Sequence, residues 1–214
     1  MPRFVNCPNE LVPAFDVAEK LIVPLFRGFK RNLDEGAIKV DEERYVISRA
    51  ESLTVAMKKQ LSSVLGSGAG VVIYQIGKTT GAADAKFYIE KTQVLNPIQR
   101  LSMGLVLFAM SGNANISILP ESTTTLNDDF LFIYDHSNSH EAEAHLKAGL
   151  PRDMPVGFFG AGYAAGWSSE SLDMKLDVQE IACTVTGHQQ CRFVMAPTHR
   201  LKDRVKEMKT LYSL

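Results

Sequence analysis

Apolar residues in the first half of this chain recur mostly at the spacing of a helix, three or four positions apart. Phe15 to Phe29 shows this spacing, with Pro24 as an expected break or kink. Helix boundaries are indicated by Gly66, which closes one segment, and by Asn96-Pro97, which opens another. The predicted helices cover residues 15–29, 50–66, 68–91, 96–112, 139–150 and 155–173.

The second half of the chain contains apolar runs that alternate with polar residues, as strands do. Strands are predicted at residues 113–122, 128–137, 175–187 and 189–197, and an earlier hairpin at residues 37–49 turns at Asp41-Glu42. Helices come first and antiparallel strands are mixed in later. This order predicts an α+β fold with helices packed on an antiparallel sheet, rather than a doubly wound parallel sheet.

Length and composition agree with one compact domain. The chain has 214 residues, 45% of them hydrophobic, and a net charge of −1, which gives no overall attraction to nucleic acid or to an anionic membrane. We predict an N-terminal helical extension at 1–39, a main domain at 40–197 and an amphipathic helix at 198–214. Three cysteines, no secretory signal and no apolar run near 18 residues predict a cytoplasmic protein without a membrane span or direct nucleic-acid binding.

Two enzyme motifs are incomplete. The stretch "GVVIYQIGKTT" ends like a phosphate-binding loop, but Val72 stands where that loop needs its first glycine. The stretch "HEAEAH" resembles a zinc-protease helix, but His140 and His145 are five residues apart and would lie about 140° apart around the helix. Solvent-exposed histidines are the better interpretation.

The stretch "QEIACTVTGHQQCRFVMAP" carries the strongest chemical signal. Gly187 can supply a turn that brings Cys191 back to Cys183, with Glu180 three residues before the first cysteine. One carboxylate and two thiolates form a partial zinc site, one ligand short of a closed structural site. The alternative is that both cysteines are buried as small apolar residues.

The same hairpin, together with "GAGYAAGWSSESL" before it, resembles the C-terminal signature of the 4-vinyl reductase-type small-molecule-binding domain. Residues 52–85 and 139–166 resemble this domain as it occurs at the N-terminus of phenol- and xylene-responsive activators. The resemblance implies a dimeric α+β ligand-binding domain with an internal apolar pocket. It implies the fold shared with nitric-oxide-sensing haem domains and vesicle-tethering subunits.

The resemblance also implies site residues. The family's zinc ligands fall on Glu180, Cys183 and Cys191, whereas its fourth ligand, a cysteine, falls on or near Phe158. Water, His188 or Cys7 could complete the site, and the sequence favours none of them.

In the aromatic sensors, one helix carries the side chain that binds the ligand hydroxyl. An ungapped match to that helix places Arg100 at the position of this side chain. A guanidinium suits carboxylates, so an acidic amphiphile becomes a candidate ligand; the alternative is an arginine that points to solvent. The candidate lining residues are aromatic or sulfur-containing and would also suit an ordinary core: Phe108, Met110, Phe130, Phe132, Tyr134, Phe159, Tyr163 and Trp167.

These observations predict a non-catalytic sensor or carrier of a small hydrophobic molecule. The first alternative is an accessory protein or reductase of tetrapyrrole (chlorophyll-type) metabolism, as the family name suggests, although no cofactor fingerprint or acid–base constellation is visible. The second is a purely structural dimerisation module, which a pocket filled by side chains would favour.

The last predicted helix bears on assembly. Leu201, Val205, Met208 and Tyr212 follow one another at intervals of four, three and four residues and form a heptad-like apolar seam. Such a helix needs a partner surface, either on its own domain or on a second subunit. We expect the second subunit, because the resemblance implies dimers; the chain is then a standalone sensor or a piece of a longer regulator. If this helix is not the interface, the segment Phe15–Asn32 is the next candidate.

Overall fold

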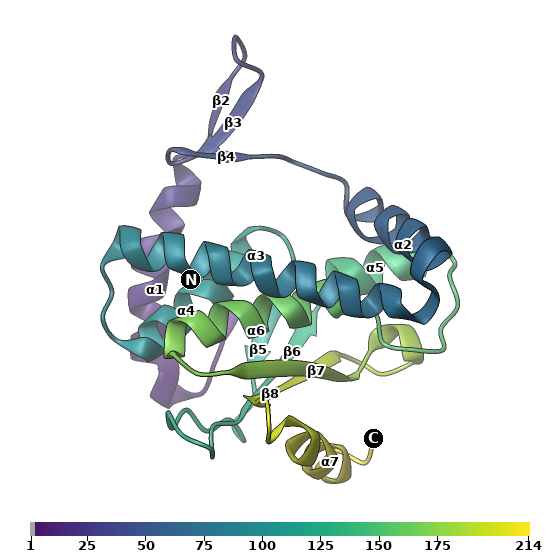
Figure 1. The fold of residues 1–214 in the computed structure, drawn as a ribbon. Helices are drawn as coiled ribbons and strands as arrows, with labels where there is room; N and C mark the ends of the chain where they lie inside the picture. The colour runs from purple at the N-terminus through teal and green to yellow at the C-terminus, as the bar shows by residue number, and fades with distance from the viewer. Residues whose placement is uncertain (1–2) are drawn as a thin grey trace.

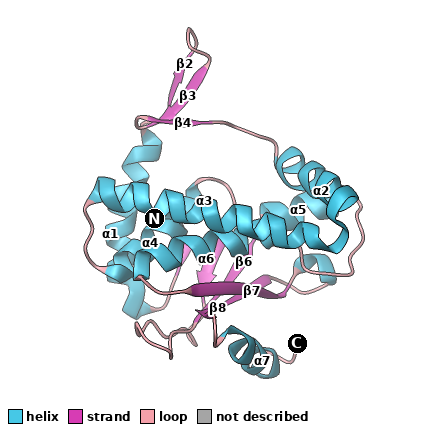
Figure 2. Ribbon diagram, in the orientation of Figure 1, coloured by secondary structure: helices cyan, strands magenta, loops and turns pink. Residues whose placement is uncertain are grey.

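The computed structural model describes residues 3–214 and shows an α+β fold, which confirms the predicted class (Figure 1, Figure 2). The helices are α1 (Val12–Arg27), α2 (Met57–Leu65), α3 (Ala69–Thr92), α4 (Pro97–Met110), α5 (His140–Lys147), α6 (Phe158–Leu172) and α7 (Leu201–Leu211). The strands are β1 (Val5–Asn6), β2 (Lys30–Asn32), β3 (Ala37–Val40), β4 (Glu43–Tyr45), β5 (Asn115–Ile118), β6 (Phe132–Ser137), β7 (Leu176–Ala182) and β8 (Cys191–Pro197).

The main sheet has five strands in the order β1-β5-β6-β8-β7. Its pairs are antiparallel except for β1 and β5, which run parallel. The sequence predicted the antiparallel strands but not the short strand β1, because two residues are too few to show alternation. The second sheet, β2-β3-β4, is small and antiparallel, and it includes the hairpin predicted around Asp41.

Side chains of the main sheet alternate between two apolar layers. Phe132 and Tyr134 of β6 join the large core beneath α1, α3, α4 and α6, whereas Ile133 points to the opposite face. On that face Val205 and Met208 of α7 cover the sheet (Figure 1). The period-two pattern of the strands therefore gives the sheet two buried faces.

The seam of α7 is occupied within the chain, which corrects our expectation of a second subunit there. Leu201 and Tyr212 pack at the edges of the same apolar cluster, and Val205 and Met208 are buried in it. An exposed apolar face on the sheet lay within reach of a short connection, so the helix covers its own domain. The predicted boundary at residue 198 falls just before this helix.

Local signals placed most helix ends correctly. The side chain of Asn96 accepts hydrogen bonds from the backbone N–H groups of Ile98 and Gln99 and so caps α4. Gly66 ends α2 with a φ of +56°, a backbone conformation that favours glycine. Pro24 lies inside α1, which continues through it to Arg27, so the chain is not broken there.

Helices α3 and α6 pack against each other at unusually short range. A Cβ atom added to Gly166 would lie 1.9 Å from the carbonyl oxygen of Lys78, and one added to Gly81 would lie 2.1 Å from that of Tyr163. Glycine is therefore required at both positions, because any side chain would overlap the facing backbone. The two helices form one layer of the core (Figure 1).

The small sheet β2-β3-β4 forms an arm that projects from the body (Figure 1). At its base Tyr45 contacts the ring of Phe26, its hydroxyl lies 2.8 Å from that of Tyr88, and Asp41 pairs with Lys91. Lys30–Asn32 is strand here, so the candidate interface segment Phe15–Asn32 is not one continuous helix. Within residues 3–214 the helices are too short or too polar to cross a bilayer.

Candidate ligand-binding cavities and cysteine cluster

A small cavity lies in the core between α4, α6 and the sheet. We call it the His136 cavity, and its volume is about 20 Å³. It is lined by Leu101, Gly104, Leu105 and Phe108 of α4, by Ile116 of β5 and His136 of β6, and by Gly160, Tyr163, Ala164, Trp167 and Ser168 of α6. A water molecule needs about 10–15 Å³ measured in this way, so an organic ligand requires side chains to move.

His136 is the polar group that sequence reasoning missed in this cavity. Burial lowers the pKa of its imidazole to about 3, so the ring is neutral at physiological pH and offers one donor and one acceptor nitrogen. Its ring stacks on Phe108 at 5.3 Å between centroids. The available signal was a histidine at the helix-facing positions of an apolar strand, after Phe132 and Tyr134.

Three of the predicted lining residues, Phe108, Tyr163 and Trp167, surround the His136 cavity. The Tyr163 hydroxyl donates a hydrogen bond of 2.8 Å to Asp84, and the Trp167 indole N–H donates one of 2.9 Å to the backbone oxygen of Arg100. Both aromatic rings are therefore held in place by bonds to groups outside the cavity lining.

Other predicted residues lie elsewhere. Phe132 and Tyr134 are fully buried in the core, and Phe159 lines a second cavity. The Nε–H of Arg100 donates a hydrogen bond of 2.6 Å to the backbone oxygen of Val94, and Arg100 is absent from the linings of the cavities described here. A role for Arg100 in reading acidic ligands stays a prediction.

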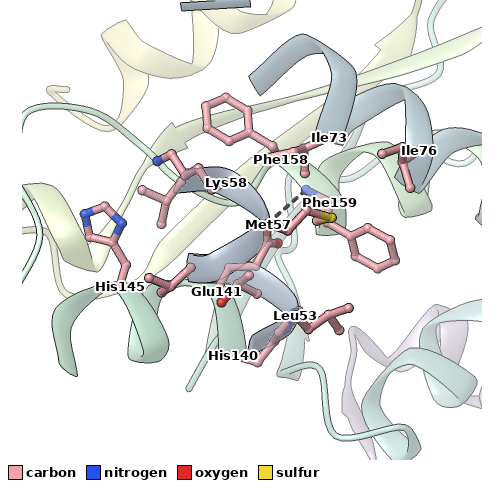
Figure 3. Close-up of a pocket in the computed structure, with 13 residues that line it drawn as sticks. Leu53, Met57, Lys58, Ile73, Ile76, His140, Glu141, His145, Phe158 and Phe159 are labelled. Carbon is pink, nitrogen blue, oxygen red and sulfur yellow. Dashed lines mark hydrogen bonds between the residues drawn. The ribbon is translucent and has the colours of Figure 1, made fainter. Parts of the chain in front are cut away.

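A larger cavity of about 80 Å³ lies where the π-helical turn Ser52–Ala56 and α2 meet α3, α5 and the start of α6 (Figure 3). We call it the His140 cavity. Its walls are mostly apolar, with His140, Glu141, His145 and Lys58 as the titratable groups. The lining residues are Leu53, Thr54, Val55, Met57, Lys58, Ile73, Ile76, His140, Glu141, His145, Val156, Phe158 and Phe159.

The histidines of α5 are buried, contrary to the expectation that they face solvent. Nδ1 of His140 lies 3.1 Å from the backbone oxygen of Asn113, and Nε2 of His145 lies 2.7 Å from that of Pro151. The spacing argument excluded a protease site correctly. That argument could not reveal that α5 lies beneath the turn Ser52–Ala56. This turn is distant in the sequence and lines the same cavity as both rings.

Glu141 joins the two cavities. Its carboxylate oxygens accept hydrogen bonds of 2.9 Å from the backbone N–H groups of Phe159 and Gly160, at the start of α6. Burial raises the pKa of this carboxyl group to about 7, although both hydrogen bonds favour the ionised form. Because Gly160 lines the His136 cavity, the bond to Glu141 forms part of a shared wall.

The hairpin of β7 and β8 brings Glu180, Cys183 and Cys191 together, with one possible ligand atom from each lying within 4.8 Å of the others. A register shift between Glu180 and Ala182 makes this convergence possible. Without the extra residue, Cys191 would face Ala182 instead of Cys183. Sequence reasoning predicted the turn but not this β-bulge. A bulge of this kind changes the direction of a side chain, here toward the candidate site.

The geometry of this cluster suits a metal ion. The two sulfurs lie 3.6 Å apart, close to the roughly 3.8 Å that separates two thiolates bound at about 2.3 Å in a tetrahedron. Oε2 of Glu180 accepts a hydrogen bond of 2.7 Å from the backbone N–H of Gly157. Its Oε1 is buried and has no partner within residues 3–214, which leaves an oxygen free to bind.

Hydrogen bonds prepare one thiol for deprotonation. The Cys183 and Cys191 thiols share a hydrogen bond, which lowers the pKa of Cys191 and raises that of Cys183. The backbone N–H of Thr184 also donates to Cys191, at 3.4 Å. Burial raises the pKa of Glu180 to about 8.

The candidates for a fourth ligand lie outside this cluster. Phe158 stands at the start of α6 and offers no ligand atom. His188 is exposed, and Cys7 lies by β1 near Arg3 and Asp16. In the described part of the chain the cluster has three members.

Comparisons with known proteins agree with the resemblance. Residues 138–197 match the 4-vinyl reductase domain, and residues 25–121 match the family described as activator of aromatic catabolism. The chain is 25% identical over 163 residues to the phenol regulator MopR of Acinetobacter guillouiae, covering 76% of this chain and 29% of that protein. The phenol-responsive sensory domain of the transcription activator PoxR, solved with phenol, superposes with a TM-score of 0.74 at 21% identity, over 94% of this chain and 96% of that one.

Proposed function

We propose that this chain, which carries a 4-vinyl reductase domain and a segment of the aromatic-catabolism activator type, is a non-catalytic sensor that binds a small hydrophobic molecule in the His136 cavity. The observation that carries the proposal is a neutral, buried imidazole set among aromatic side chains in the core. Such cavities, apolar with one or two placed polar groups, are typical of small-molecule sites. The chain spans 29% of the length of the regulator MopR, so any output step belongs to other parts of such a protein.

The chemistry of the cavity favours a neutral ring with one hydroxyl group. A neutral imidazole can donate to or accept from a hydroxyl, whereas a carboxylate would enter a cavity without a cationic side chain in its wall. The names of the two relatives reported above both refer to phenol, so phenol is a suitable probe. Trp167 is the single tryptophan of the chain and lines the cavity, so its emission reports ligand entry.

Replacing His136 with Phe is expected to raise the dissociation constant for phenol by about two- to tenfold and to leave that for toluene unchanged. The substitution keeps an aromatic ring and removes one hydrogen bond, whose net contribution is roughly 0.5–1.5 kcal/mol. Titration followed by Trp167 emission measures both dissociation constants. The control is His199→Phe, because His199 is exposed and lies outside the cavity. If the affinities for phenol and toluene fall equally, His136 does not recognise the hydroxyl group.

A structural dimerisation module remains the second candidate, and the small volume of the His136 cavity favours it. The same titration separates the two functions. A parent protein whose Trp167 emission responds to neither phenol nor toluene at millimolar concentration favours the structural module. The reductase alternative gains no comparable observation.

Zinc bound by Glu180, Cys183 and Cys191 is part of the proposal. The sulfur separation, the free oxygen of Glu180 and the lowered pKa of Cys191 support it. Zinc at this hairpin would hold the end of β7 against the start of β8 and, through Glu180, the residue before α6. Its role would be structural, since none of the three residues lines the His136 cavity, although Cys191 pairs with His136 across β8 and β6.

A homodimer formed through the arm completes the proposal. Leu33 at the arm's turn is 89% exposed, and Val46 and Ile47 after β4 are 83% and 65% exposed. Exposed apolar residues at the turn of a projecting arm and just after its last strand are typical of an interface.

The double variant Leu33→Glu, Val46→Glu is expected to be monomeric by light scattering, because it places charges in that interface. Val64→Glu, at an equally exposed position on α2, is the control and should leave the dimer intact. A monomeric parent, or a double variant that stays dimeric, contradicts this arrangement.

A further inference from the structure

The His140 cavity offers a ligand more room than the His136 cavity does. Its volume of about 80 Å³ is several times the roughly 10–15 Å³ that one water molecule needs. The rings of Phe158 and Phe159 form part of the wall, and Ile73 of α3 is buried beside them (Figure 3). Size and lining therefore suit one ring or a molecule of similar bulk.

One acceptor on a residue that lines this cavity lacks a partner. Nδ1 of His140 faces the backbone oxygen of Asn113, so the ring proton belongs on Nδ1 and Nε2 carries a lone pair. Nε2 is buried, and within residues 3–214 it has no hydrogen-bond partner. The whole residue is only 8% exposed. An unpaired buried acceptor is costly, and a ligand that donates to it removes that cost.

The other polar groups in the wall restrict the charge that a ligand can carry. Both oxygens of Glu141 are engaged by backbone N–H groups of α6, and Nε2 of His145 is engaged by Pro151. Lys58 places its ammonium 5.4 Å from the centre of the Phe158 ring, which disfavours a cationic ligand. Glu141, whose pKa is about 7, disfavours an anion in its ionised form, so a neutral molecule is favoured.

The segment over the cavity is suited to let a ligand pass. Residues 46–51 cross from the arm to α2 without helix or strand, apart from the first turn of the helix that follows (Figure 1). The π-helical turn Ser52–Ala56 comes next, and turns of this kind are frequent at functional sites. This cover is less firmly packed than the α3 and α6 layer, because Leu53 remains 45% exposed.

We propose that the His140 cavity is a second small-molecule site, which takes a neutral single-ring alcohol or phenol whose hydroxyl donates to Nε2 of His140. The site is separate from the His136 cavity, and the two share the wall formed by Glu141 and Gly160. Occupation of one site can therefore alter the other through the start of α6.

The test uses fluorine NMR of the full chain with 4-fluorophenol and 4-fluorotoluene as probes. Val55→Phe fills the His140 cavity, and Val64→Phe is its control on the exposed side of α2. Ala164→Leu fills the His136 cavity. We expect a bound 4-fluorophenol signal that Val55→Phe abolishes and that Val64→Phe and Ala164→Leu preserve. The proposed sensor cavity gives a second bound signal, which Ala164→Leu abolishes and Val55→Phe preserves.

His140→Phe gives a second readout that does not depend on blocking the cavity. The parent should prefer 4-fluorophenol over 4-fluorotoluene at this site by about two- to tenfold, and the variant should lose that preference. Circular dichroism checks that each variant is folded.

The outcomes separate this inference from the proposed function. If every bound signal is lost with Ala164→Leu and none with Val55→Phe, the second site is overturned and the sensor cavity is supported. If every bound signal is lost with Val55→Phe and none with Ala164→Leu, the second site is supported and the sensor cavity is contradicted. The absence of any bound signal at millimolar probe overturns the second site.

Discussion

Gly166→Ala is expected to lower the free energy of unfolding by about 3 kcal/mol. The new methyl group would lie 1.9 Å from the carbonyl oxygen of Lys78 and 2.9 Å from the backbone nitrogen of Ala82. Backbone atoms cannot swing aside as a side chain can, so α3 and α6 must separate along their length. Urea unfolding followed by circular dichroism measures the loss.

The control for this prediction is Gly68→Ala, at the residue before α3. A Cβ atom there meets only the Cβ of Leu65, at 3.8 Å, and Gly68 has no positive φ. A change of a few tenths of a kcal/mol is expected at such a position. If Gly166→Ala unfolds as the parent does, the close approach of the two helices is wrong.

The contact between α3 and α6 also positions both cavities. α6 carries Tyr163 and Trp167 to the His136 cavity and begins with Phe158 at the His140 cavity, while α3 contributes Ile73 to the latter. A shift of α6 that accommodates a methyl group therefore alters both the His136 cavity and the His140 cavity. Loss of binding in Gly166→Ala should accompany loss of stability.

Local signals in the sequence predicted the elements well, because each depends on a few neighbouring residues. Asn96-Pro97 begins a helix, Gly66 ends one, and Gly187 turns the last hairpin with a φ of +95°. The hairpin then brings the two cysteines together as predicted. Whether the cluster holds zinc does not follow from this convergence.

The close packing of α3 and α6 could have been read from two short patterns, "GKTTG" and "GYAAG". Glycines four residues apart lie on one face of a helix and let another backbone approach. Gly77 and Gly81 form such a face on α3, and Gly162 and Gly166 form one on α6. Read one at a time, these glycines only weaken a helix prediction.

Contacts between distant segments explain the remaining errors. His140 and His145 were expected in solvent, because their spacing on α5 says nothing about the turn at Ser52 that covers them. The seam of α7 was expected on a second subunit, because a heptad-like pattern does not identify its partner surface. Here the second face of β6 and β8 supplied that surface, through Ile133 and Val194.

Removal of zinc is expected to destabilise the parent protein by about 3–4 kcal/mol, the linkage expected when free metal exceeds its dissociation constant several-hundredfold. The reason is that Glu180, Cys183 and Cys191 converge only in the folded chain, so binding at the site contributes to folding. Metal analysis should find about one zinc per chain in the parent and little in Cys183→Ser. Urea unfolding with and without a chelator measures the difference in stability.

The chelator separates a metal site from a pair of buried thiols. Cys183→Ser alone would cost stability in either case, because Cys183 is fully buried and its thiol is hydrogen-bonded to that of Cys191. A metal site predicts in addition that the chelator shifts the parent but not Cys183→Ser. Cys7→Ser is the matched control, since Cys7 lies outside the cluster and should keep both the zinc and the chelator response. A parent that contains no zinc and ignores the chelator leaves Cys183 and Cys191 as packing residues, and the free oxygen of Glu180 then needs another partner.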